Sequence, residues 1–173
     1  AGANLTAVLK LEHKYWARRE QQAVVPELIP DFCAVDPFAD DPAESLSIDY
    51  PLWLKPIKAH SSYLGFRIHN DREWRHAIEQ TRRGIEQFAK PFNEILAFAD
   101  LPGAIAPIGG YHCIAESIIS AGQQCTLEGY AYQGEVVVYG VVDSVRGGRH
   151  RSSFQRYQYP STLPWRVQSR MID

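Results

Sequence analysis

One stretch of the chain constrains its fold more than any other, residues 51–68, with the sequence PLWLKPIKAHSSYLGFRI. The apolar run Leu52–Leu54 predicts a buried strand, and Lys55 and Pro56 follow it directly. A short polar loop comes next, and Gly65–Ile68 resumes an extended pattern. A lysine at the end of an apolar strand is either an ordinary solvated charge beside a hairpin or a charge that a ligand uses. The stretch alone leaves both interpretations open.

The first part of the chain also carries helical patterns. Leu5–Gln22 contains many good helix formers and no proline, which predicts a helix. Asn70 with Glu73 three residues later is typical of a helix start with a capping box. The amphipathic pattern after Asn70 predicts a helix to about residue 90, which we expect Pro91 to end.

The last third of the chain has the pattern of strands. Cys125–Tyr132 and Glu135–Val142, joined at Gln133-Gly134, predict an antiparallel hairpin. A short helix is expected over Trp165–Ile172, because Pro164 is tolerated in a first helical turn. The chain ends soon afterwards.

We therefore expect an α+β fold in two small lobes with antiparallel sheets and flanking helices. The first lobe, residues 1–110, is expected to be rich in helix and to hold Lys55. The second lobe, residues 111–173, is expected to be mainly antiparallel β-structure. A chain of 173 residues is long enough for one domain with a core or for two such lobes.

Composition excludes several classes of protein. The chain is 45% hydrophobic and 22% charged, as in a soluble globular protein. Eighteen basic against 20 acidic residues give a net charge of −2, which offers no electrostatic case for nucleic acid as the main partner. No window approaches the roughly 20 apolar residues that cross a membrane. Three scattered cysteines without a CxxC pair indicate reduced thiols, and no signal peptide is visible, so we expect a cytoplasmic protein.

Several features now follow one another in an order that resembles the ATP-grasp superfamily of carboxylate ligases. That superfamily includes biotin carboxylase, D-alanine–D-alanine ligase and L-amino-acid ligases. The features are Lys14 in a helix, Lys55-Pro56 with its serine-containing loop, the segment Ala115–Ile119, the run Gly122-Gln123-Gln124 with the hairpin after it, and the segment Pro160–Pro164.

The resemblance implies roles for particular residues. Lys14 and Lys55 would touch the nucleotide phosphates as point charges, and the loop with Ser61 and Ser62 would close over them. Glu116 and Ile118 would frame the adenine, because the edge of an extended segment offers backbone N–H and C=O groups to it.

Other residues fit the resemblance less directly. Gln124 stands where relatives carry an acidic residue that binds the ribose, and it keeps hydrogen-bonding capacity without the charge. Arg146, Arg149 and His150 lie in a basic, glycine-rich loop. They would contact the triphosphate or a substrate carboxylate, since arginine suits both anions. The alternative for this loop is a solvated β-turn.

The implied cofactors are ATP and Mg²⁺, but the metal ligands of the family are missing. Relatives carry a Glu and then a Glu-x-Asn on later strands, whereas no Glu-x-Asn occurs here and Glu135 is the last glutamate. We therefore assign no metal ligand and no catalytic residue in this chain. We expect the Mg²⁺ ligands outside it, in a longer polypeptide of which this chain is a piece.

The function implied by the resemblance is that of an ATP-dependent ligase. It would activate a small carboxylate as an acyl-phosphate, which an amine or another nucleophile would attack. A nucleotide-binding or interaction module without catalysis is the first alternative, favoured by Gln124 and the missing metal ligands. An RNA-binding α+β domain is the second, and the near-neutral charge opposes it. The substrate, the nucleophile and the existence of a homo-oligomer stay open.

Overall fold

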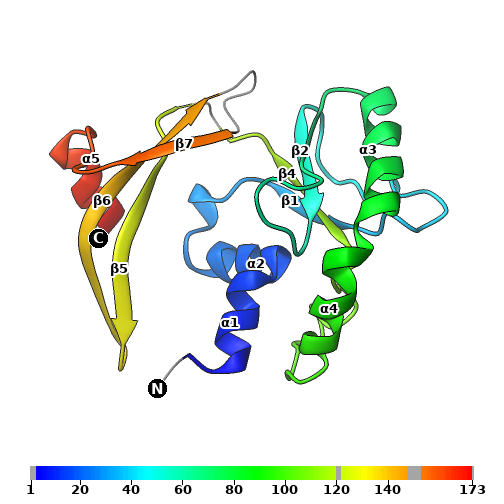
Figure 1. Ribbon diagram of the computed structural model, residues 1–173, viewed down its shortest axis with the longest axis horizontal. Helices are drawn as coiled ribbons and strands as arrows, with labels where there is room; N and C mark the ends of the chain where they lie inside the picture. Colours follow the sequence, from blue (N-terminus) through cyan, green and yellow to red (C-terminus); the bar gives the residue numbers. More distant parts are fainter. Residues whose placement is uncertain (1–2, 120–121, 148–152, 173) are drawn as a thin grey trace. The chain divides into compact units, whose positions relative to one another are not determined.

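A computed structural model describes residues 3–119, 122–147 and 153–172 of the chain (Figure 1). The chain divides into two compact units, Ala1–Ile119 (unit 1) and Ser120–Asp173 (unit 2). The boundary lies at residues 119/120, not at residues 110/111 as expected from the sequence. The reason is that the strand Cys113–Ser117 pairs within the sheet of unit 1.

Unit 1 contains four α-helices and one four-stranded antiparallel sheet among its described residues. Its elements are α1 (Leu5–Glu12), α2 (Lys14–Val24), a 3₁₀ turn (Pro26–Leu28), β1 (Phe32–Val35), β2 (Leu52–Pro56), β3 (Phe66–Ile68), α3 (Asp71–Gly84), α4 (Glu86–Leu96) and β4 (Cys113–Ser117). The strand order is β1-β4-β2-β3, so β4 lies between β1 and β2 (Figure 1). The extended pattern expected after the polar loop is β3, which pairs antiparallel with β2.

Alternation along β2 decides which side chains enter the core. Leu52 and Leu54 are fully buried and pack in one cluster with Trp74 of α3. Successive side chains of a strand point to opposite faces of the sheet, so Trp53 and Lys55 lie on the face away from that cluster. This second face is where a lysine side chain can remain partly exposed.

The expected helix Leu5–Gln22 is two helices, which meet at His13. The His13 ring is fully buried, and its Nδ1 accepts a hydrogen bond from the Trp16 backbone N–H at 3.1 Å, which caps α2. Its Nε2 lies 2.7 Å from the Ile108 carbonyl oxygen and donates to it in the neutral tautomer. Burial lowers the pKa of His13, which favours that neutral form.

The prediction that Pro91 ends a helix is wrong. The helix that begins after Asn70 is α3, and it already ends at Gly84. Pro91 lies inside the next helix, α4. Proline costs α4 one backbone hydrogen bond, but Ala89 and Phe92 beside it are buried in the core. Packing of an apolar face outweighs local propensity here, as it does in most helices of folded proteins.

Unit 2 contains one three-stranded antiparallel sheet and a helix among its described residues. Its elements are β5 (Cys125–Tyr132), β6 (Glu135–Gly147), β7 (Ser153–Gln158) and α5 (Trp165–Ile172), with the strand order β5-β6-β7. The expected hairpin and C-terminal helix are both confirmed. Gln133 (φ 51°) and Gly134 (φ 86°) both have positive φ, as a type I′ hairpin turn requires.

None of the helices in the described parts of the chain is both long enough and apolar enough to cross a membrane.

Candidate functional site

A buried carboxylate on β4 holds Lys55 in place. In the sheet Lys55 lies opposite Ile114, and Glu116 is two residues farther along the same strand. Diagonal neighbours of this kind come within reach of one another when a side chain is long. The Lys55 Nζ forms an ion pair with Glu116 Oε2. The lysine at the end of the apolar strand is therefore partnered and not simply solvated.

Arg18 of α2 occupies the other oxygen of the same carboxylate. Its Nε donates to Glu116 Oε1 at 2.5 Å. Glu116 is only 5% exposed. Burial alone would raise the pKa of Glu116, but Lys55 and then Arg18 outweigh burial and lower it. Glu116 is thus an ionised, buried carboxylate with one cation on each oxygen.

Lys14 lies one helical turn before Arg18 and anchors the start of the polar loop. Its Nζ donates to the Ala59 carbonyl oxygen at 2.8 Å and to the Ile57 carbonyl oxygen at 3.3 Å. Burial, followed by the charges of Lys55 and Lys58, lowers the pKa of Lys14 to about 8. Lys14 therefore lies close enough to Lys55 and Lys58 for their positive charges to disfavour its own.

These side chains form what we call the Lys55 cluster, consisting of the cations Lys14, Arg18, Lys55 and Lys58 and the carboxylates Glu12 and Glu116. Glu12 pairs with Lys58, and Glu116 pairs with Lys55 and Arg18. Four cations against two carboxylates leave the cluster with an excess of positive charge. Such an excess beside a solvent-exposed loop attracts anions, and phosphate groups suit lysine well.

The polar loop next to the cluster has an unusual backbone. Ser61 (φ 52°) and Ser62 (φ 59°) both have positive φ, and the Tyr63 N–H donates to the His60 carbonyl oxygen at 3.0 Å. Leu64 (φ 52°) is also left-handed. Residues other than glycine seldom adopt this conformation, and it costs about 1 kcal/mol or more each. Both serines are exposed, although the Ser61 hydroxyl lies 3.1 Å from the His60 Nδ1 and the Ser62 carbonyl oxygen accepts from the Gly65 N–H at 3.1 Å.

The remaining expected residues lie elsewhere in the two units. Ile118 follows the end of β4 and is half-buried, and the neighbouring Ser117 N–H donates to the Asp31 carbonyl oxygen at 2.8 Å. Gln124 is an exposed residue of unit 2 just before β5. Arg146 lies on β6, where its guanidinium carbon is 5.7 Å from the Phe154 ring centroid. Arg149 and His150 are outside the described residues.

Sequence reasoning overlooked two cations of the cluster. Arg18 had the pattern of a solvated helix charge, and Lys58 carried no signal except its place in the loop. The four-residue spacing of Lys14 and Arg18, which puts both on one face of a helix, is the signal that relates Arg18 to the site. The matching carboxylate lies 98 residues away along the chain, so sequence spacing does not reveal the pair.

Sequence reasoning also missed Asp143, which organises unit 2. Its Oδ1 accepts from the Ser161 hydroxyl at 2.5 Å, and its Oδ2 accepts from the Thr162 backbone N–H at 2.9 Å and hydroxyl at 2.7 Å. Burial alone would raise the pKa of Asp143, but these hydrogen bonds, first that of Ser161, lower it to about 2. Asp143 therefore holds the segment Pro160–Pro164, one of the features in the sequence resemblance, against the end of the sheet.

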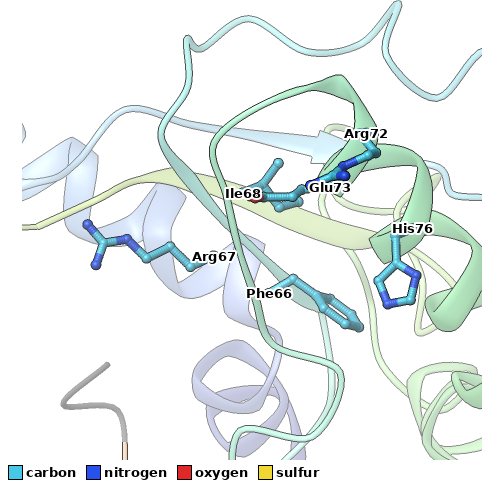
Figure 2. Close-up of a pocket in the computed structure, with 6 residues that line it drawn as sticks. All are labelled: Phe66, Arg67, Ile68, Arg72, Glu73 and His76. Atoms are coloured by element: carbon cyan, nitrogen blue, oxygen red, sulfur yellow. The ribbon is translucent and has the colours of Figure 1, made fainter. Parts of the chain in front are cut away.

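A separate pocket of unit 1 lies beside the edge strand β3 and the start of α3. Its volume is about 360 Å³, and it is lined by Phe66, Arg67, Ile68, Arg72, Glu73 and His76. Figure 2 shows the Phe66 and His76 rings on one side and the Arg67 side chain extending away from them. None of the residues expected to bind a nucleotide lines it. In the described parts of both units, no group of three or more His, Cys, Asp or Glu side chains is arranged to hold a metal ion.

Comparison with known proteins gives likeness in fold without likeness in sequence. No protein-family model matches the chain, and no curated protein sequence matches it. An L-amino acid ligase from Bacillus licheniformis matches 99% of this chain with a TM-score of 0.70 and 19% identity. D-alanyl-alanine synthetase A from Vibrio cholerae matches 96% with a TM-score of 0.61 and 10% identity. Carboxyaminoimidazole ribonucleotide synthase from Aspergillus clavatus, solved in complex with ATP, matches 96% with a TM-score of 0.59 and 16% identity.

At these identities the likeness shows the fold. The chain spans 36% of the ligase from B. licheniformis, 45% of the synthetase from V. cholerae and 36% of the synthase from A. clavatus. These solved neighbours are ATP-grasp ligases, and the α+β fold of this chain is the fold of the corresponding part of such ligases.

Proposed function

We propose that the Lys55 cluster binds the phosphates of ATP, and that the chain is the nucleotide-binding part of an ATP-grasp ligase. The observation that carries this proposal is the excess of positive charge beside an exposed loop at the end of β2. The likeness in fold supports it, and one of the solved neighbours is a complex with ATP.

Each residue of unit 1 has a role in the proposal. Lys14 and Lys55 bind phosphate oxygens as point charges. Ser61 and Ser62 close over the phosphates, since successive backbone N–H groups in this conformation can point to one anion, and the Ser61 hydroxyl would exchange its contact with the His60 ring for a phosphate oxygen. The backbone of Ile118, just past the end of β4, would read the adenine edge. Glu116 is opposite Phe32 and Trp53 within the sheet, and its side chain is engaged with Lys55 and Arg18, so it would frame the adenine from β4 without offering a free edge.

Two groups of unit 2 complete the proposal. Gln124 would hydrogen-bond a ribose hydroxyl through its uncharged amide. Arg146, with Arg149 and His150, would bind the triphosphate or a substrate carboxylate.

The proposed reaction has two steps. An oxygen of a small carboxylate substrate attacks the γ-phosphorus of ATP, the bond to the bridging oxygen breaks, and ADP leaves. The acyl-phosphate is then attacked at its carbonyl carbon by an amine or another nucleophile, and inorganic phosphate leaves. This chemistry needs neutralisation of phosphate charge, for which we propose Mg²⁺. Because no group of three or more His, Cys, Asp or Glu side chains is arranged to hold a metal ion in the described parts of the chain, we propose no particular ligand of Mg²⁺ among them.

We also propose a cytoplasmic location. All three cysteines are free thiols in the structure, which suits a reducing compartment.

A non-catalytic nucleotide-binding or interaction module is the second candidate. Gln124 favours it, because an amide binds ribose hydroxyls without the charge of the usual carboxylate. The two candidates differ in turnover. A ligase turns ATP over repeatedly to ADP and phosphate when a carboxylate and a nucleophile are supplied, whereas a binding module binds ATP and releases no ADP.

The test of nucleotide binding compares Lys55→Met with wild type in the full-length protein. Methionine keeps much of the apolar stem but leaves Glu116 with Arg18 alone among the cations of the cluster, so the gain with MgATP is compared with the ligand-free stability of the same variant. MgATP at about 100 times its Kd stabilises the wild type by about 2.7 kcal/mol, which thermal unfolding detects. We expect Lys55→Met to lose most of that gain and the exposed control Lys90→Met to keep it. No gain with millimolar MgATP in the wild type refutes the ATP proposal.

A further inference from the structure

We propose that Arg18 is a positioning residue, which keeps Lys55 available to phosphate by sharing the Glu116 carboxylate with it. This proposal rests on the proposed function, since it assigns to Arg18 an effect on ATP binding. Arg18 would act through Glu116 and Lys55 and would not touch the nucleotide.

The division of the carboxylate between two cations is the first argument. Glu116 Oε1 accepts from Arg18 and Oε2 pairs with Lys55, so each oxygen serves one partner. Because Glu116 is 5% exposed, water cannot easily replace a lost partner. Without Arg18, Lys55 would be the one cation of the cluster that still pairs with the Glu116 carboxylate. Lys55 would then be bound more tightly to Glu116, and less of its charge would be available to a phosphate.

The use of the Arg18 donors is the second argument. Its Nε is bound to Glu116, and its Nη1 donates to the Gln21 side-chain oxygen at 2.8 Å. The side chain is 22% exposed. Two nitrogens of the guanidinium are thus engaged with other side chains of the protein, which fits a residue that orients others.

The place of Arg18 on α2 is the third argument. Lys14 and Arg18 are four residues apart and lie on one face of the helix. Lys14 binds the carbonyl oxygens of Ile57 and Ala59 at the start of the loop, and Arg18 binds Glu116 on β4. One face of α2 therefore fixes the loop and Lys55 relative to each other, as a phosphate site requires.

A double-mutant cycle on the full-length protein tests the proposal, with Kd for MgATP measured by calorimetry. We expect Arg18→Gln to weaken ATP binding about fivefold or more in the wild-type background, the scale of one charge-assisted contact. In the Lys55→Met background we expect Arg18→Gln to change Kd by less than about twofold, because its effect passes through Lys55. Arg18→Lys should restore most of the affinity. Arg19→Gln, at the exposed neighbour on the same helix, is the control.

The alternatives give other results in the same cycle. A direct contact between Arg18 and phosphate, or a general field effect of its charge, would weaken ATP binding equally in both backgrounds. That result, or wild-type affinity in Arg18→Gln, overturns the proposal.

A second measurement does not depend on ATP. The rate at which acetic anhydride acetylates Lys55, followed by mass spectrometry, should fall about threefold in Arg18→Gln, because a tighter ion pair protects the amine. The rate at Lys90 should not change. An unchanged Lys55 rate overturns the positioning role even if ATP binds. If Lys55 is acetylated more slowly in Arg18→Gln but the wild type does not bind ATP, the result supports the effect of Arg18 on Lys55 and refutes the proposed function.

Discussion

Asp143 offers a graded test of how unit 2 holds together. Asp143→Asn keeps the shape of the side chain and removes its charge. The new amide can turn its oxygen toward Thr162, where it still accepts from the backbone N–H and the hydroxyl, while its NH₂ donates to the Ser161 oxygen. Only the Ser161 hydroxyl hydrogen loses its acceptor, and because that hydroxyl can rotate, the loss is mainly the extra strength of hydrogen bonds to a charged acceptor. We expect a cost of about 1 kcal/mol.

Asp143→Ala removes the acceptor altogether. The two hydroxyls can rotate, and each loses a net contribution of about 1 kcal/mol. The Thr162 N–H cannot rotate, and leaving this donor without a partner costs about 2 kcal/mol more. The sum is about 4 kcal/mol, which is a large part of the 5–15 kcal/mol that a typical domain has.

Urea unfolding of the two variants and of the exposed control Asp40→Asn measures these costs. Amide hydrogen exchange at Thr162 and Leu163 reports the local effect, because the Leu163 N–H donates to the Ser161 oxygen at 3.1 Å. In the wild type, the stability that Asp143 contributes is present above the unfolded pKa of 3.8 and is lost as the pH falls through about 2. That loss should be absent in Asp143→Asn. Equal costs for the two variants, or a cost below about 1 kcal/mol for Asp143→Ala, contradict the hydrogen-bond account.

Three further predictions concern unit 1. The pKa of Lys14 is about 8 in the fold against 10.5 for a free lysine, so the unfolded chain binds more protons between these values, and Lys14 should make stability rise with pH in that window. Urea midpoints from pH 8 to 10 should show a smaller rise in Lys14→Met. Burial raises the pKa of Cys113 to about 12, so iodoacetamide should label Cys33 well before Cys113 in the native protein, as peptide mass spectrometry would show. Ser61→Gly should raise the unfolding free energy by about 0.5 kcal/mol, because relief of left-handed strain exceeds the entropic cost of glycine. Ser47→Gly, at an exposed position without positive φ, should lower it.

Local signals explain what the sequence predicted well. The hairpin of β5 and β6 was predictable because Gln133-Gly134 separates two β-rich runs and glycine accepts positive φ. The helix Trp165–Ile172 was predictable because Pro164 marks its start. Asn70 was recognised as a cap, and its side chain accepts from the backbone N–H groups of Arg72 and Glu73 at 3.1 Å.

Long-range contacts explain what the sequence did not predict. The strand β4 was expected in the second lobe because the chain takes on the pattern of strands from residue 111, but its partners β1 and β2 lie far back in the chain. Pro91 was read as a helix end, although the burial of Phe92 beside it keeps α4 intact. Each error has the same cause, since pairing and packing with distant residues outweighed a local rule.

The candidate site combines both kinds of information. Lys55 could be found from a local pattern, because a charge at the end of an apolar run is conspicuous. Its meaning depends on Glu116, which only the pairing of β2 with β4 brings within reach. A half-buried lysine without a partner lowers the stability of the fold, and pairing with one buried carboxylate is enough to offset that loss. Arg18 then adds a second cation to the same carboxylate, which stability alone does not require. We infer that the excess positive charge of the Lys55 cluster serves to bind an anion. Arg18 and Lys55 should therefore be tested together.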